Sequence, residues 1–505
     1  MAHTWIWAVA VTILAAHLLT KNLLHARAQR RKAHSLGCLP PPALRMHDRL
    51  FGSDIVIRIF NALRAHSLLE QLADIFNEYG PTVYTPILAL PPIQTIESEN
   101  VKVVLSDINI FGLGPHRIRM LGPLSGHGIF TTEGAAWKRS RQLLRPNLTK
   151  SQALNLPMFE RHIDDLLKLI PRNSETVNLQ TLFTSLTVDS GTELLFGISC
   201  NSLQESSSVD TNASFAKSLD AAQEEIVKRD ILGPVLVKLR SEKAFRRNLK
   251  TVHDFIDSYV VRALASYKTE KAEDDQKEKE EEKRYIFLQE LSKQTTDPLA
   301  LRWETLNVLI AGRDTTAVLL SNTWFILSRR RDIWTKLKHS IAHLDGAPPT
   351  LSQLSELKYV RWILHETLRL YPVLPINART AYRDTTLPRG GGPDGNSPVF
   401  IPKDSEVAWN TWAMHRRTDY FGDDAEEFVP ERWETLRPGW EYLPFNGGPR
   451  RCLGEEYALM EASYTTIRMA QRFRSVEARD EKPWTEKMGV VTSSLHGCQV
   501  SITFE

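Results

Sequence analysis

A ten-residue segment near the C-terminus, Phe445 to Gly454, constrains this chain more than any other feature. It reads FNGGPRRCLG and places Cys452 after a glycine-rich turn, with Arg450 two residues before the cysteine. Glycines allow backbone N–H groups to approach a sulfur atom closely and to hydrogen bond to it. A cysteine in such a setting is typical of a thiolate that binds a metal ion, whereas a structural cysteine has no need of this pattern. We therefore predict that Cys452 is a metal ligand.

The other three cysteines, Cys38, Cys200 and Cys498, lie far apart and have no comparable surroundings. They form no CxxC pair, so neither a zinc site nor a dense disulfide framework is expected, and reduced thiols in a reducing compartment fit best. The 63 basic and 60 acidic residues nearly balance, which gives no reason to expect a nucleic acid as partner.

The N-terminal segment predicts a membrane anchor. Thr4 to Thr20 is apolar and carries no formal charge, and basic residues begin at Lys21. Positive charge after the apolar stretch favours a cytosolic C-terminal side, as in a single-pass protein of the endoplasmic reticulum membrane. A cleaved signal peptide is the alternative, but a basic start and a small-residue cleavage site are not evident. We expect an anchor in residues 1–24, a basic and proline-rich linker in 25–45, and a catalytic domain in 46–505.

The pattern along the rest of the chain predicts a mainly α fold with small β-sheets. Short β-rich runs lie between residues 80 and 105, and helical periodicity dominates residues 101–260, 299–337 and 351–371. The glycine-rich run from Arg389 to Gly395 lacks the Gly-Lys-Ser/Thr ending of a phosphate-binding loop, so a hairpin turn is expected there. The mixed-charge run 270–284 is expected to be solvated surface.

A second motif, Ala311 to Thr316 (AGRDTT), lies within the long helical pattern. Gly312 costs helix stability and leaves space beside the helix. The Thr315 hydroxyl can loosen a helical hydrogen bond. Asp314 and Thr315 together offer an acid–alcohol pair that can relay protons by general acid catalysis. We therefore predict that Asp314 and Thr315 are catalytic.

Two further patterns predict charged contacts. Glu366 and Arg369 stand three residues apart on one helix face and can pair, and Arg432 of the PERW segment can complete a network that holds the chain leading to Cys452. Trp137 and Arg141 stand four residues apart on another helix face.

These motifs, in this order, resemble the cytochrome P450 superfamily over nearly the whole chain. The resemblance implies the P450 fold, with haem b between the helix that carries Asp314 and the Cys452 loop, and with Cys452 as the axial ligand of the iron. It implies that Phe445 shields the thiolate and that the haem propionates bind Arg450, Trp137 and Arg141 on one side and Arg379 on the other. It also implies dioxygen as co-substrate and electrons from NADPH through a membrane-bound reductase.

The substrate remains open at this point. The segments FGLGP, GIFTT and LPRGGGPDG look like those of the fungal alkane- and fatty-acid-hydroxylating group. We expect a monooxygenase acting on a lipophilic compound, with secondary metabolism and primary lipid oxidation as alternatives. An enzyme that rearranges peroxides and a haem sensor without turnover are further alternatives, which the Asp314–Thr315 pair disfavours. Family resemblance puts the pocket walls in residues 112–129, 306–315, 373–377 and 492–495. Basic residues that could receive the reductase are Lys138, Arg139, Arg145, Lys150 and Arg451.

Overall fold

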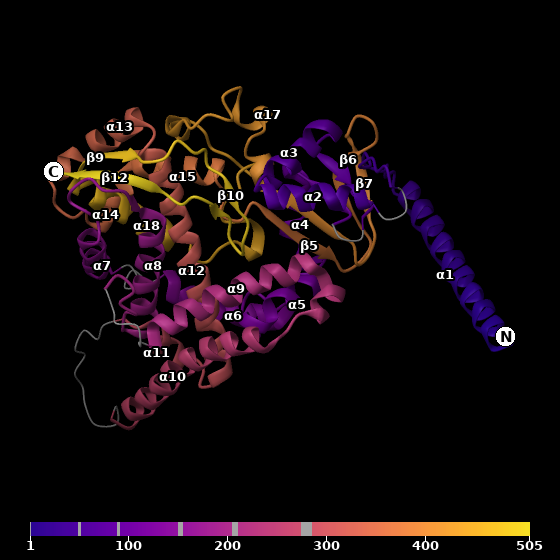
Figure 1. Cartoon of the computed structure of the whole chain (residues 1–505), viewed down its shortest axis with the longest axis horizontal. Helices are drawn as coiled ribbons and strands as arrows, with labels where there is room; N and C mark the ends of the chain where they lie inside the picture. The colour runs from indigo at the N-terminus through magenta and orange to yellow at the C-terminus, as the bar shows by residue number, and fades with distance from the viewer. Residues whose placement is uncertain (1, 49–51, 88–90, 150–154, 205–210, 274–284) are drawn as a thin grey trace.

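The computed structural model describes residues 2–48, 52–87, 91–149, 155–204, 211–273 and 285–505 (Figure 1). The helices in chain order are α1 Ala2–Ser35, α2 Ser53–Ala65, α3 Leu68–Tyr79, α4 Ser98–Ser106, α5 Gly114–Ser125, α6 Gly134–Thr149, α7 Leu156–Lys168, α8 Leu179–Phe196, α9 Thr211–Leu236, α10 Lys243–Glu273, α11 Phe287–Ser292, α12 Pro298–Leu327, α13 Arg331–Ile341, α14 Leu351–Glu356, α15 Lys358–Leu370, α16 Thr411–Met414, α17 Thr418–Phe421 and α18 Glu455–Arg472. Short 3-10 turns are η2 Val237–Leu239, η3 Ala342–Leu344, η4 Pro430–Glu434 and η5 Gly448–Arg450.

The strands are β1 Thr82–Tyr84, β2 Ile93–Thr95, β3 Phe111–Gly112, β4 Val177–Asn178, β5 Ile376–Ala381, β6 Thr385–Gly391, β7 Ser397–Ile401, β8 Glu406–Asn410, β9 Phe473–Ala478, β10 Glu486–Lys487, β11 Ser493–Ser494 and β12 Gln499–Phe504. The largest sheet has the order β1-β2-β8-β5-β3, in which β2 and β8 run parallel and the other pairs antiparallel. The mainly α class with small sheets is therefore confirmed.

The body of the molecule has a helical part and a sheet-rich part (Figure 1). The β6–β7 hairpin, together with α2, α3 and α4, lies at the end from which α1 projects, and the long helices α8, α10, α12 and α18 form the other part. β6 and β7 pair antiparallel around the Arg389–Gly395 run, which confirms the expected hairpin.

Helix α12 is the central element, and its sequence explains its position. Asp297 caps its first turn by accepting a hydrogen bond from the Leu299 N–H, and Pro298 occupies the first helical position. Buried residues occur all round the helix between Leu301 and Leu327, which is typical of a helix enclosed by others. It runs without interruption through Gly312 and ends at Leu327, so the expected helical stretch 299–337 is two helices, α12 and α13.

The N-terminal region differs from expectation in two ways. Within the described residues, no helix combines the length and the apolar character needed to cross a membrane. The anchor expected in residues 1–24 is therefore not supported. A spanning helix needs about 20 mostly apolar residues, and the apolar stretch Thr4 to Thr20 is shorter.

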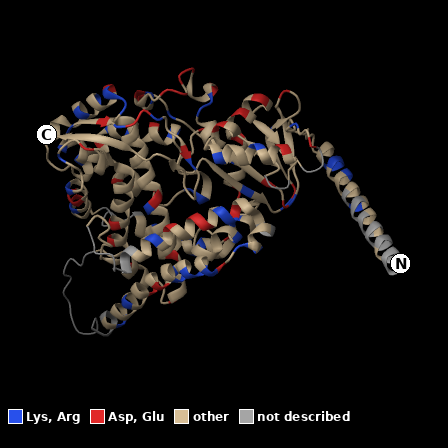
Figure 2. Cartoon of the chain, in the orientation of Figure 1, with Lys and Arg blue, Asp and Glu red and all other residues tan. Residues whose placement is uncertain are grey.

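Helix α1 also continues through the basic part of the expected linker to Ser35, and this basic half lies nearest the globular body (Figure 2). The proline-rich segment after it packs against the body instead of acting as a free spacer, because the Leu39 N–H bonds to the Pro398 carbonyl and the Leu44 N–H to that of Tyr84. The mixed-charge run is helical to Glu273, and its residues 274–284 lie outside the described residues.

Candidate active site

The Cys452 loop is held by its own backbone and by a close contact with α4. The Cys452 N–H donates to the Phe445 carbonyl at 3.0 Å and the Arg451 N–H to that of Gly448 at 3.1 Å. Gly448 has φ +67°, and a Cβ on it would lie 2.1 Å from the Leu105 carbonyl oxygen. Only glycine meets both demands, so the turn that precedes Cys452 depends on this residue.

The loop brings the Cys452 sulfur to the N-terminus of α18, whose N-cap is Gly454. Cys452 is exposed to the cavity described below, but the surrounding protein shields it from bulk water, and this desolvation raises the pKa of its thiol. The Gly454 N–H, which hydrogen bonds to the thiol, opposes this effect. The positive end of the helix dipole also favours an anion at this position. The Gly454 N–H and the helix dipole therefore stabilise part of the negative charge of a thiolate, and a bound cation would neutralise the rest.

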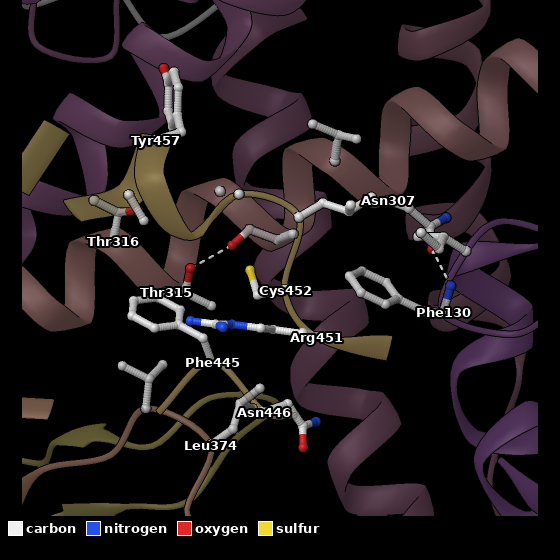
Figure 3. Close-up of a pocket in the computed structure, with 18 of the residues that line it drawn as sticks. Phe130, Asn307, Thr315, Thr316, Leu374, Phe445, Asn446, Arg451, Cys452 and Tyr457 are labelled. Atoms are coloured by element: carbon white, nitrogen blue, oxygen red, sulfur yellow. Dashed lines mark hydrogen bonds between the residues drawn. The ribbon is translucent and has the colours of Figure 1, made fainter. Parts of the chain in front are cut away.

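Cys452 faces a cavity of about 300 Å³ that α12 closes on the other side (Figure 3). Gly312, Thr315 and Thr316 of α12 line it together with Phe445. Apart from the adjacent backbone of α12, no heavy atom of the described residues lies within 4 Å of where a Cβ on Gly312 would stand, so this glycine leaves open space. The Thr315 hydroxyl donates to the Ala311 carbonyl at 2.6 Å. The cavity thus has a thiol on one wall and a hydroxyl beside a gap on the other.

Asp314 does not join Thr315 at the cavity, which differs from the predicted acid–alcohol arrangement. Among the described residues, those that line the cavity include Arg313 and Thr315 but not Asp314. The Asp314 carboxyl accepts a hydrogen bond from Gln223 of α9 at 2.8 Å, and burial raises its pKa. Residues 314 and 315 are adjacent in the chain and about 100° apart around the helix, so they face different neighbours.

The predicted arginines gather at one end of the cavity, and the structure adds one that the sequence did not indicate. Arg379, Arg450 and Arg117 of α5 all line it, and within the described residues none of the three forms an ion pair. Burial, together with a smaller repulsion from the neighbouring arginines, lowers the pKa of Arg379 to about 9 and that of Arg450 to about 10. Arg117 follows a short strand in an ordinary helical turn, so no local pattern could have identified it.

Trp137 and Arg141 of α6 line the same end of the cavity. The Arg450 guanidinium carbon lies 4.5 Å from the centre of the Trp137 ring, and that of Arg141 lies 5.7 Å from it. Arg141 also donates to the Arg451 carbonyl at 3.0 Å. Helix α6 is therefore joined directly to the Cys452 loop.

These residues fit a haem. The Nε atoms of Arg117 and Arg450 are buried, and neither has a hydrogen-bond partner among the described residues. Several buried guanidinium groups without anions are costly unless anionic groups enter among them. The two propionates of haem b would supply such anions at this end, while the Cys452 sulfur offers the iron a soft anionic ligand.

Glu366, Arg369 and Arg432 form a buried network behind the Cys452 loop. Glu366 and Arg369 are fully buried and pair at 2.7 Å, and Arg432 donates to Glu366 at 2.9 Å. Glu366 also accepts from the Val429 N–H and from Trp433, while Arg369 donates to three backbone carbonyls. Every charge is paired, which is the condition for such a network to be tolerated, and removal of one partner would cost about 3–5 kcal/mol.

The walls of the cavity come from three of the four segments expected. Leu113, Ile129, Val308, Val373 and Leu374 contribute apolar side chains. The turn 492–495 does not line the cavity; instead the Thr492 N–H donates to the Val373 carbonyl and supports that wall from behind. Phe130 is held in the wall by α12, since its N–H donates to the Asn307 side chain (Figure 3).

The fold and the site together define a haem-thiolate protein with an apolar cavity. The family model for cytochrome P450 matches residues 54–497. The chain is 42% identical over 497 residues to the cytochrome P450 monooxygenase himC of Aspergillus japonicus, covering 97% of this chain and 88% of the relative. It is 38% identical to the cytochrome P450 monooxygenase FPY7 of Fusarium mangiferae (98% and 96% covered) and 40% identical to cytochrome P450 52A13 of Debaryomyces hansenii (90% of each covered).

This chain therefore belongs to the cytochrome P450 family. It is a monooxygenase, an oxidoreductase whose cofactor is haem-thiolate iron and whose electrons come from NAD(P)H through a redox partner.

Proposed function

We propose that this enzyme inserts one oxygen atom of dioxygen into a C–H bond of a lipophilic compound, as a step of fungal secondary metabolism. The observation that carries the proposal is the cavity on which the Cys452 thiol, the Gly312 gap and the Thr315 hydroxyl meet apolar walls. Such walls favour a substrate with few charges. Terminal oxidation of alkanes or fatty acids is the second candidate, supported by the segments shared with that group.

We assign the following roles to the residues of the site. Cys452 ligates the haem iron, and Phe445 covers the sulfur. Arg379 and Arg450, with Trp137 and Arg141, bind the propionates, and Glu366, Arg369 and Arg432 hold the loop. The bound haem supplies oxygen activation. Thr315 passes protons into the gap beside Gly312, and Asp314 supplies them. A haem sensor would not need this proton path.

We further propose that residues 46–505 form the catalytic domain, that the redox partner is an NADPH–cytochrome P450 reductase, and that the enzyme works at the endoplasmic reticulum membrane. Helix α1 projects from the body, and its basic residues suit the anionic cytosolic face of a membrane (Figure 2).

The thiolate assignment is tested with Cys452→Ala and Cys452→His in the full chain loaded with haem. Cys452→Ala should lose the ferrous–carbon monoxide band typical of thiolate ligation, and Cys452→His should shift the band to the position of an imidazole ligand. A band unchanged in Cys452→Ala would contradict the assignment at its root. Comparison of metabolites between a strain with the gene and one without it would then distinguish a secondary metabolite from an alkane or fatty acid.

A further inference from the structure

Asp314 is held by α9, a helix that is far from α12 in sequence. The Gln223 side-chain N–H donates to Asp314 Oδ2 at 2.8 Å. Gln223 is only 8% exposed, so this amide has little access to water. In Figure 1, α9 lies beside α12. This hydrogen bond therefore connects Asp314, the predicted proton donor on α12, to a second helix, α9.

A second link runs parallel to the first. Arg313 is 3% exposed, and its Nη1 lies 2.5 Å from Asp220 of α9 and 3.2 Å from Asp314 Oδ1. Asp220 is 60% exposed, so this end of the group reaches solvent. Asp220 and Gln223 stand three residues apart and thus share a face of α9. Gln223 contacts Oδ2 of the Asp314 carboxyl and Arg313 contacts Oδ1, while Asp220 pairs with Arg313 and so fixes that arginine against α9.

We propose that Gln223 is a positioning residue for proton delivery: with Arg313 and Asp220 it holds the Asp314 carboxyl against α9, at the solvent side of Thr315. The inference rests on the proposed role of Asp314. Helix geometry turns the acid and the alcohol to different neighbours, and the Gln223 contact fixes which neighbour the acid meets. A displacement of α9 would change the contacts that Gln223 and Arg313 make with the Asp314 carboxyl. The position of α9 would therefore govern when a proton can reach the Thr315 hydroxyl.

The contact between Gln223 and Asp314 can be measured through the pKa of the Asp314 carboxyl. Burial raises the pKa of its carboxyl, and Arg313 and the Gln223 hydrogen bond lower it, whereas Asp220 raises it again. Loss of the Gln223 donor leaves the charged form with one hydrogen bond fewer. The proton affinity of Asp314 should therefore rise.

The test is an infrared pH titration of the ferric, haem-loaded full chain without substrate. The carboxyl band of Asp314 is the one lost in Asp314→Asn. In Gln223→Leu its midpoint should move upward by about one pH unit, a tenfold change in proton affinity. Glu224→Gln is the matched control, because Glu224 is adjacent on α9, 68% exposed and paired only at the surface with Lys228, and it should leave the midpoint unchanged.

An unchanged midpoint in Gln223→Leu would overturn the proposal. If that variant does not fold, Gln223→Met, closer in shape, is titrated with the same two outcomes. In turnover with reductase and NADPH, the pH profile should move with the carboxyl midpoint while the KM for NADPH stays the same; a profile that does not move also overturns it. A separate measurement tests the proposed role of Asp314 itself. If Asp314 does not supply protons, Asp314→Asn will consume NADPH and release peroxide at the same rates as the unsubstituted enzyme.

Discussion

At the scale of single residues, Arg117 shows how the structure extends the predicted haem site. Its guanidinium donates to Asn377 at 3.2 Å and lies close enough to Arg379 and Arg450 to lower their pKa values. Its Nε has no partner in the part of the chain that the structure describes. A propionate beside these groups would offset the repulsion among the three arginines and would accept a hydrogen bond from the Arg117 Nε–H.

We predict that Arg117→Leu weakens haem retention. One charge-assisted hydrogen bond contributes about 1.5–3 kcal/mol, so haem should pass to an apomyoglobin acceptor at least roughly tenfold faster. Arg119→Leu is the control, since Arg119 is exposed on the same helix. Equal transfer rates for the two variants would exclude Arg117 from the haem site.

Thr315 supports a second prediction at this scale. Its hydroxyl lies at the Gly312 gap, whereas the neighbouring Thr316 hydroxyl is buried and finds no hydrogen-bond partner within the described ranges. Thr315→Val should divert NADPH-derived electrons to hydrogen peroxide, with product per NADPH falling by about tenfold or more, because a proton donor in the site is lost. Thr316→Val should change this ratio little. Peroxide and product are measured in the same reaction, and equal ratios for the two variants would remove Thr315 from the proton path.

At the scale of elements, α12 is joined to the segments around it by buried polar groups as well as by apolar packing. Glu304 is 4% exposed and accepts hydrogen bonds from Ser140 of α6 and from the Ile129 backbone, while none of the described residues donates a hydrogen bond to its Oε2. Burial raises the pKa of this carboxyl from 4.5 to about 7. The folded state therefore favours the neutral form of Glu304.

We predict a pH dependence of stability from Glu304. A carboxyl whose pKa is higher in the folded than in the unfolded state loses stabilisation as pH rises from 4.5 through about 7, because a charge must then be buried. Glu304→Gln should remove this loss and make the protein more stable at pH 8, by at most about 3 kcal/mol, with little change at pH 5. Denaturant unfolding at both pH values measures it. Exposed Glu356→Gln on α14 serves as control, and the same pH response in both variants would refute the prediction.

At the scale of the whole molecule, a basic surface lies beside the Cys452 loop, which is the predicted thiolate side of the haem site. Lys138 and Arg139 of α6 are exposed, and Arg141 of the same helix contacts the Cys452 loop. Arg145 and Arg451 are exposed too, although Arg451 is paired with Glu455, and Lys150 lies outside the described residues. Electrons that enter by the shortest route would cross this surface.

We predict that reversing Lys138 and Arg139 to Glu slows reductase-supported turnover by about tenfold at low salt, because complementary charge steers association. The difference should shrink as salt rises. Reduction by dithionite should be unchanged, since it needs no docking. Reversal of Arg262 and Lys268, exposed on α10, is the control. Equal salt dependence for both double variants would place the reductase elsewhere.

Much of this site could be predicted because its determinants are local. The Phe445–Gly454 motif, the three-residue spacing of Glu366 and Arg369, and the glycines of the β6–β7 hairpin act through neighbours in the chain, and the hairpin and the mainly α class are confirmed. The end of α12 at Leu327 was not foreseen, because residues 328–330 carry no proline or glycine to mark the break.

By itself the sequence predicted the Cys452 loop as the ligand loop and α12 as the helix that faces it, and it determined the family, since short-range spacing decides which side chains can share a face. Only the tertiary structure decided that Asp314 is turned to α9, that Arg117 joins Arg379 and Arg450, and that the turn 492–495 supports the cavity wall from behind. The physical reason is the distance along the chain: Gln223 and Asp314 are 91 residues apart, and their contact exists only because the packing of whole helices brings them together.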